Sequence, residues 1–264
     1  MTAERISPPP QSDGESSVAA KPSMPIASET SEPRHEGGSA RAEPPVLHYA
    51  LFDPGSTYVR LLLAEKGLAA DLRREKPWER PAHILRHSPD GRLPVLIDGD
   101  HALVDAVAIG EYLEERHSEP PLLPVESPAR CETRRLVQWF LVKCVTEVTR
   151  IVVGERFLKR FLRLGEPDSA ALRAAHHNLK THLAYIGYLA EHRHYLAGRR
   201  YSLADAAAAA NVLILDYFGD IDWARHDAAK EWYLRVKSRR AVRSLLGEQL
   251  PGLPPAAHYA KLDF

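Results

Sequence analysis

The feature that most constrains the fold is a change in hydrophobic pattern near Pro128. Before it, residues 45–118 alternate strand-like and helical patterns in the order β-α-β-α-β-β-α. The last two strands are joined by Asp98-Gly99, which favours a hairpin turn. After it, residues 128–250 show only helical periodicity. These patterns predict a small mixed α/β sheet domain with helices on both faces, followed by an all-helical domain.

Polar residues and glycine mark the expected ends of several helices. Ser56 follows a turn-forming stretch and is predicted to cap the first helix through its hydroxyl, and Gly67 is predicted to close it. Farther along, Ser202 and Asp205 have capping-box spacing, with Asp in place of the usual Glu. The helix that follows is crowded with alanine over residues 206–210, which predicts a central position because small side chains let neighbouring helices approach closely.

Composition excludes several classes of protein. The chain of 264 residues has 35 basic and 35 acidic residues, so no net charge draws it to nucleic acid. Insertion into a membrane is not expected, because no apolar run reaches the roughly 20 residues that span a bilayer. Cys131 and Cys144 are too far apart for a CxxC motif, which indicates reduced thiols in a cytoplasmic protein. Residues 1–44 contain no aromatic residue and are predicted to be a disordered N-terminal extension.

No motif for metal binding or nucleophilic catalysis is evident. The tightest histidine groups, at 176–177 and 192–194, lack cysteine or carboxylate partners at ligand spacing, so no metal site is predicted. The sequence has neither a G-x-S-x-G elbow nor a phosphate-binding loop.

The last residues mix apolar and acidic side chains after a proline-rich spacer. Tyr259, Leu262 and Phe264 supply the apolar groups, and Asp263 with the terminal carboxylate supplies charge. Prolines block continuation of the last helix and favour an extended segment. Residues 251–264 are therefore either a peptide-like ligand for a groove on another protein or a tail packed on its own domain.

Taken together, these features resemble the glutathione transferase superfamily over about residues 46–249. The resemblance implies an N-terminal thioredoxin-like domain, an all-helical C-terminal domain and a homodimer. Pro94 matches the cis-proline of the superfamily. The segments that carry the resemblance, in order along the chain, are residues 53–61, 93–96, 105–113 and 202–205.

The same resemblance implies a glutathione site that has degenerated here. Enzymes of the superfamily hold the glutathione sulfur as a thiolate, which the carboxylate of Asp53 would repel. Ser56 is either a thiolate donor or only a helix cap. Ala106 replaces a serine that binds the γ-glutamyl end, so one hydrogen bond worth about 1.5–3 kcal/mol is lost. Asp105 either binds the glutamyl amine or caps its helix. With Pro94, these are vestigial site positions, and no catalytic residue or cofactor is predicted.

The ending of the chain resembles that of the FzlA-like branch, whose members bind the division GTPase FtsZ and are not regarded as glutathione-dependent enzymes. This resemblance implies a non-enzymatic regulator that acts at the division site and modulates the bundling or curvature of FtsZ filaments. Its contacts would be Tyr259, Leu262, Asp263 and Phe264. The alternative is a glutathione transferase, or a related glutathione-dependent thiol enzyme, with an atypical active site.

Overall fold

The first part of the chain builds a four-stranded mixed sheet with the order β2-β1-β3-β4. The computed structural model describes residues 43–262. Strand β1 pairs in parallel with β2 and antiparallel with β3, and β3 pairs antiparallel with β4 across the predicted hairpin. The strands are β1 (Val46–Ala50), β2 (Asp71–Glu75), β3 (Val95–Asp98) and β4 (His101–Val104).

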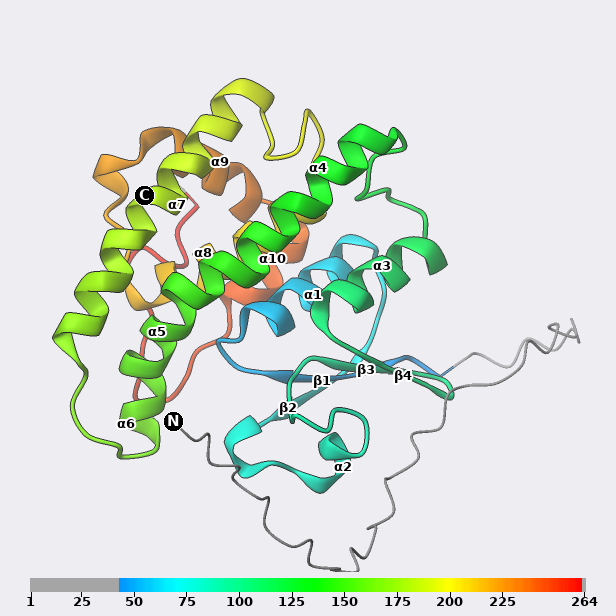
Figure 1. Cartoon of the computed structure of the whole chain (residues 1–264), viewed down its shortest axis with the longest axis horizontal. Coiled ribbons are helices and arrows are strands. Elements are labelled where there is room, and N and C mark those ends of the chain that lie inside the picture. Colours follow the sequence, from blue (N-terminus) through cyan, green and yellow to red (C-terminus); the bar gives the residue numbers. More distant parts are fainter. Residues whose placement is uncertain (1–42, 263–264) are drawn as a thin grey trace, which may run out of the picture. The chain divides into compact units, whose positions relative to one another are not determined.

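Three helices cover the two faces of this sheet. Figure 1 shows α1 (Pro54–Glu65) and α3 (Ala106–Arg116) above the sheet and α2 (Ala82–Leu85) below it. Leu47 and Leu96 are fully buried and belong to the same core as apolar side chains of α1. The resulting α/β unit is the predicted thioredoxin-like arrangement of a sheet between helices.

The rest of the described chain is helical. One long helical run is α-helical at both ends but π-helical over Trp139–Thr149 and Gly154–Leu158, a detail that periodicity did not predict. The helices of this part are α4 (Ser127–Gln138), α5 (Arg150–Val153), α6 (Lys159–Phe161), α7 (Ser169–Arg193), α8 (Leu203–Phe218), α9 (Asp227–Lys237) and α10 (Arg240–Leu246). None of the helices within residues 43–262 is long and apolar enough to cross a membrane.

Helix α8 lies at the centre of the helical part, as its alanines predict. Every residue of α8 from Leu203 to Tyr217 is buried, and residues 206–210 are completely inaccessible. Because these side chains are small, α1, α4 and the π-helical segment Trp139–Thr149 all pack closely against α8. The predicted domains, 45–118 and 128–250, meet through the contact between α1 and α8, while their exact bounds stay predictions.

The ends of α1 correct one prediction and confirm another. Ser56 is not the N-cap: the helix begins at Pro54, and the side chain of Asp53 accepts the N–H of Ser56. Proline is favoured in the first turn, where its missing N–H costs nothing, so the cap moves to the residue before it. At the other end, Gly67 has φ +66°, the conformation expected of a residue that closes a helix.

Asp205 performs the predicted capping role and more. Its carboxylate is fully buried, and one oxygen accepts hydrogen bonds from the N–H of Ser202 at 3.0 Å and its hydroxyl at 2.9 Å. The other oxygen accepts from the N–H of Leu196 and from Nε1 of Trp232 on α9, both at 2.9 Å. The start of α8 is therefore tied to the preceding loop and to a neighbouring helix.

We predict that Asp205→Ala lowers the free energy of unfolding by at least about 3 kcal/mol, because several buried donors lose their acceptor and each such loss costs about 1–3 kcal/mol. Denaturant unfolding measures the change. Asp168→Ala is the matched control: Asp168 caps α7 in an exposed position with two N–H groups, so its loss should cost only about 1 kcal/mol. Equal losses for the two variants would contradict the role assigned to Asp205.

Candidate functional site

The structure brings together, around Gly55, three of the positions that the resemblance assigns to a vestigial glutathione site. A Cβ atom at Gly55 would lie 3.2 Å from Cβ of Ala106 and 3.3 Å from both Cδ of Pro94 and Oδ2 of Asp53. The Leu93–Pro94 peptide bond is cis. The N-terminal ends of α1 and α3 thus meet beside the start of β3, where the resemblance places the glutathione thiol.

Ser56 cannot present its hydroxyl to a thiolate in this arrangement. The side chain is 0% exposed, and its Oγ accepts the backbone N–H of Ala50 at 3.0 Å. Asp53, the predicted source of repulsion, is half-buried and holds the N–H of Ser56 at 2.6 Å. Burial raises the pKa of the Asp53 carboxyl, although hydrogen bonding from Ser56 opposes that shift. The Asp53 carboxylate is therefore occupied in capping α1, and the Ser56 hydroxyl in holding that helix to the end of β1.

Asp105 takes the helix-capping role of its two alternatives. Its carboxylate accepts the N–H groups of Val107 at 2.8 Å and Ala108 at 3.2 Å. Its backbone has φ 80° and ψ 129°, a conformation that costs a non-glycine residue about 1–3 kcal/mol. The two hydrogen bonds at the start of α3 help to offset this strain. Ala106 is buried and offers no side-chain donor.

The sequence did not reveal the residues that hold the C-terminal segment against the helical part. Tyr217, at the end of α8, donates its hydroxyl to the carbonyl of Leu253 at 2.6 Å and accepts the N–H of Leu250 at 3.1 Å. Its own carbonyl accepts the N–H of Ala256 at 2.9 Å. These contacts hold residues 250–256 along the end of α8.

A buried carboxylate, Asp216, fixes the next part of the tail. It accepts hydrogen bonds from Nε1 of Trp223 and the hydroxyl of Tyr233, both at 2.8 Å, and lies 2.7 Å from Nε2 of His258. Nζ of Lys237 lies 3.4 Å from both Asp216 and the carbonyl of His258. Burial lowers the pKa of Lys237, and the nearby carboxylate opposes the shift. In the sequence, this site is indicated only by Asp216 itself, an aspartate that directly follows an apolar run and therefore needs buried partners.

Tyr259 packs into its own domain. It is 5% exposed, and its ring meets that of Tyr217 edge to face with centroids 5.2 Å apart. The burial raises the pKa of the phenol. Of the predicted contact residues, Leu262 is 38% exposed, whereas Asp263 and Phe264 lie outside the described residues. The tail therefore follows the self-packing alternative as far as Tyr259, and Leu262 lies beyond that anchor.

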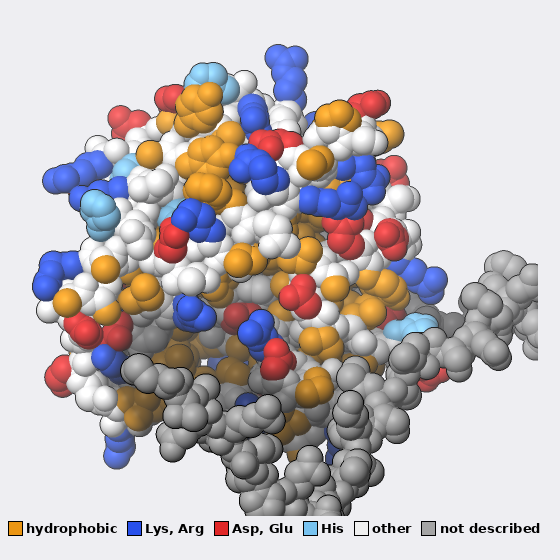
Figure 2. Space-filling model, viewed as in Figure 1, with side chains coloured by type: hydrophobic (Ala, Val, Ile, Leu, Met, Phe, Trp, Pro, Cys, Tyr) orange, Lys and Arg blue, Asp and Glu red, His pale blue; other side chains and the backbone are white. Residues whose placement is uncertain are grey.

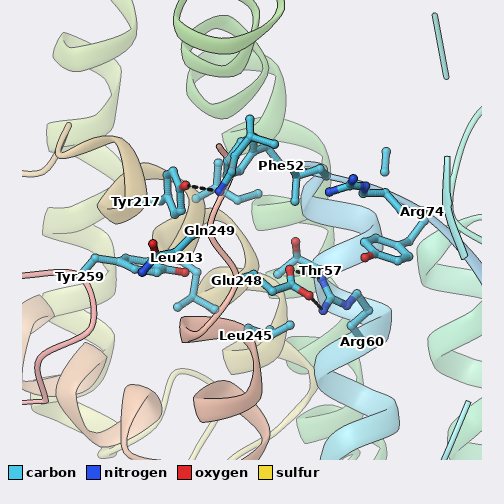
Figure 3. Close-up of a pocket in the computed structure, with 15 residues that line it drawn as sticks. Phe52, Thr57, Arg60, Arg74, Leu213, Tyr217, Leu245, Glu248, Gln249 and Tyr259 are labelled. Carbon is cyan, nitrogen blue, oxygen red and sulfur yellow. Dashed lines mark hydrogen bonds and ion pairs between the residues drawn. The ribbon is translucent and has the colours of Figure 1, made fainter. Parts of the chain in front are cut away.

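A pocket of about 180 Å³ separates this tail from the start of α1. Figure 3 shows Thr57 and Arg60 of α1 on one side and Tyr217 and Tyr259 on the other. An ion pair between Arg60 of α1 and Glu248 crosses the junction, with the guanidinium 4.6 Å from the ring centroid of Tyr49. These contacts join the thioredoxin-like part to the segment that precedes the tail.

The face of the molecule drawn in Figure 2 carries side chains of both charges, with basic and acidic groups interspersed. Both cysteines are free thiols, with Cys131 exposed and Cys144 buried. Burial raises the pKa of Cys144 to about 12, so this thiol is not poised for nucleophilic chemistry.

Comparison with known proteins identifies the class to which this fold and site belong. A family profile for the glutathione S-transferase N-terminal domain matches residues 47–121. A crystal structure described as a glutathione S-transferase from Sinorhizobium meliloti 1021 is 42% identical, with a TM-score of 0.80, and the match covers 84% of this chain and all of the other. The fold is that of the glutathione transferase superfamily.

Two further matches define the branch. The chain is 46% identical over 222 residues to FtsZ-localized protein A of Caulobacter vibrioides (strain NA1000 / CB15N), covering 83% of this chain and 97% of that protein. The structure of FzlA from C. crescentus matches with 45% identity and a TM-score of 0.81, covering 84% of this chain and all of the other. The chain belongs to the family of FtsZ-localized protein A within the glutathione transferase superfamily.

We predict that Ser56→Ala has no effect on glutathione conjugation, which stays at background in both proteins, but lowers the free energy of unfolding by about 1–3 kcal/mol because the buried N–H of Ala50 loses its acceptor. The assays are turnover with glutathione and an activated aryl halide, and denaturant unfolding. Thr57→Ala is the control, since the carbonyl that its hydroxyl contacts retains a backbone donor. Wild-type turnover of about 1 per second or more that fell in Ser56→Ala would contradict this prediction.

Tyr259→Ala should lower the free energy of unfolding by about 2 kcal/mol or more, because it removes a buried aromatic ring. Leu262→Ala, three residues after that anchor and exposed, should change it by less than about 0.5 kcal/mol. Denaturant unfolding of the two variants makes the comparison. Similar small effects would mean that Tyr259 does not anchor the tail.

Proposed function

We propose that this protein is a non-enzymatic regulator of cell division that associates with FtsZ filaments at the division site. The observation that carries the proposal is the 46% identity to FtsZ-localized protein A across 97% of that protein. The match spans 222 residues, so it extends well beyond the sheet domain alone.

The state of the glutathione positions supports a non-enzymatic role. The hydroxyl of Ser56 is buried and accepts a backbone hydrogen bond, and the carboxylates of Asp53 and Asp105 start helices. Ala106 provides no hydroxyl for a γ-glutamyl group. Lowering the pKa of a thiol from about 8.5 requires a hydrogen-bond donor or a positive charge near the sulfur, and these four side chains supply neither.

The C-terminal tail is the partner contact in this proposal. Tyr217, Asp216 and Tyr259 hold the chain up to residue 259 against the body of the protein. Tyr259 is thus a fixed anchor shortly before the contact residues Leu262, Asp263 and Phe264. Because the anchor is already held in place, less conformational entropy is lost when these residues bind FtsZ. Tyr259 contributes by placing this segment, and Leu262 offers apolar surface to FtsZ.

Dimerisation would make the protein bivalent for FtsZ. A homodimer, which the superfamily resemblance implies, carries two tails on one rigid body. Two tails can bind two FtsZ subunits, so the second contact forms at a high effective concentration. Contacts within one filament would alter its curvature, and contacts between filaments would bundle them.

Removing Leu262–Phe264 should weaken co-sedimentation with polymerised FtsZ by at least about thirtyfold, since a central aromatic or apolar contact contributes about 2 kcal/mol or more. The melting temperature should not change, because the anchor at Tyr259 remains. Asp263→Lys should also weaken binding if the acidic group meets a basic site. Val125→Ala, which alters an exposed apolar side chain in the loop before α4, is the control. Full binding by the truncated protein would place the FtsZ contact elsewhere.

A glutathione-dependent activity is the second candidate, and the strained backbone of Asp105 favours it. Such conformations cluster at ligand-binding sites, where surrounding structure maintains them. Retention on immobilised glutathione together with turnover of an activated aryl halide would establish this function. Absence of both, with FtsZ co-sedimentation intact, distinguishes the regulator from the enzyme.

A further inference from the structure

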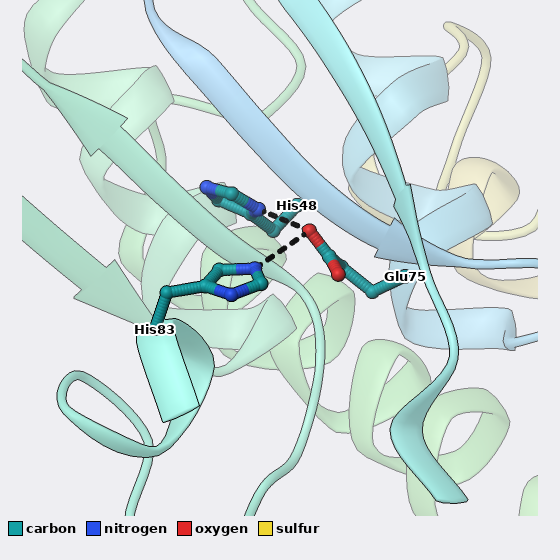
Figure 4. A group of neighbouring side chains, drawn as sticks. All are labelled: His48, Glu75 and His83. Atoms are coloured by element: carbon teal, nitrogen blue, oxygen red, sulfur yellow. Dashed lines mark hydrogen bonds and ion pairs between the residues drawn. The ribbon is translucent and has the colours of Figure 1, made fainter. Parts of the chain in front are cut away.

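Three potential metal ligands meet below the sheet, although they are far apart in the sequence. Nδ1 of His48 lies 2.7 Å from Oε1 of Glu75, and Nε2 of His83 lies 3.0 Å from the same oxygen. One ligand atom from each residue lies within 4.8 Å of the others. Figure 4 shows the two imidazole rings on one side of the Glu75 carboxylate, both directed toward it.

The topology of the sheet explains why these side chains converge. In the parallel pair, His48 of β1 lies opposite Arg73 of β2, and Glu75 is two residues further on. Side chains two residues apart lie on the same face of a strand, so Glu75 and His48 share a face. Helix α2, which carries His83, lies below the sheet (Figure 1) and completes the group.

We propose that His48, Glu75 and His83 form a binding site for a divalent transition-metal ion of the zinc class. Two imidazoles and one carboxylate are a ligand set that binds Zn²⁺ with a water molecule in the fourth position. His48 is 8% exposed, whereas the side chain of His83 is 52% exposed, so solvent can reach the open side of the site.

The geometry requires only a small adjustment to accept the ion. Ligand atoms at the corners of a tetrahedral zinc site are separated by about 3.3 Å when the metal–ligand bonds are about 2.0–2.1 Å. The two distances to Oε1 of Glu75, 2.7 and 3.0 Å, are slightly shorter. The Glu75 carboxylate must move slightly away from both nitrogens. Rotation of the exposed His83 ring adjusts the position of its Nε2, which lies within 4.8 Å of the other ligand atoms, while the buried His48 fixes the position of the site.

The local charges also suit a cation. A glutamate carboxylate is ionised at neutral pH and is therefore available as a ligand. Arg73, the basic residue on the same face, lies 3.0 Å from the carboxylate of Asp71. A bound ion would connect β1, β2 and the four-residue helix α2.

The test uses the full chain without an affinity tag, freed of metal with a chelator that is then removed. Calorimetric titration with ZnCl₂ at pH 7.5 should show one ion bound per chain, and zinc should raise the melting temperature. The complex with Co²⁺ should show the visible absorption of a low-symmetry, four-coordinate site.

His83→Ala should weaken zinc binding at least tenfold and abolish the thermal shift. Because this side chain is exposed, the variant should fold without zinc with the wild-type melting temperature. His87→Ala is the matched control. It removes an exposed histidine four residues after His83 that is not part of the cluster, so this variant should bind zinc as the wild type does. The proposal is overturned if the wild type shows no saturable binding, if His83→Ala binds equally well, or if both variants lose binding together.

Discussion

The burial of α8 imposes the constraint on which the rest of the structure depends. A helix that is surrounded by protein must satisfy its polar groups internally, because an unpaired buried carboxylate is strongly destabilising. Asp205 near its start accepts donors from the preceding loop and from α9. Asp216 near its end accepts donors from α9 and from His258 of the tail. The two carboxylates thus determine the path of the chain at both ends of the helix.

This constraint relates the fold to the proposed function. The tail is seated by Tyr217 and Asp216, so its position follows from the packing of the helical core rather than from contacts of the tail alone. In the thioredoxin-like part, the carboxylate of Asp53 caps α1, and the hydroxyl of Ser56 ties that helix to the end of β1. The positions that the resemblance assigns to a glutathione site thereby contribute to stability here, and the segment after Tyr259 provides the contact that we propose for FtsZ.

Local patterns in the sequence predict much of this structure. Strand alternation, the Asp98-Gly99 turn and Gly67 are short-range signals, and the observed order of elements agrees with them. The sequence predicts Ser56 as the first cap, whereas Asp53 holds that position, because Pro54 lies in the first turn of the helix. The burial of Tyr259 was not predictable from local patterns, since it depends on residues of α8 and α9 that are far away in the sequence. The His48–Glu75–His83 group was missed for the same reason: its members come from three elements.

The central claim is that the folded body serves to position a tail that binds FtsZ. Hydrogen–deuterium exchange of the full chain, measured with and without polymerised FtsZ, tests it most directly. The account predicts added protection in the tail after Tyr259 and little change at the starts of α1 and α3. Protection centred on Asp53 and Asp105, with an unchanged tail, would contradict it.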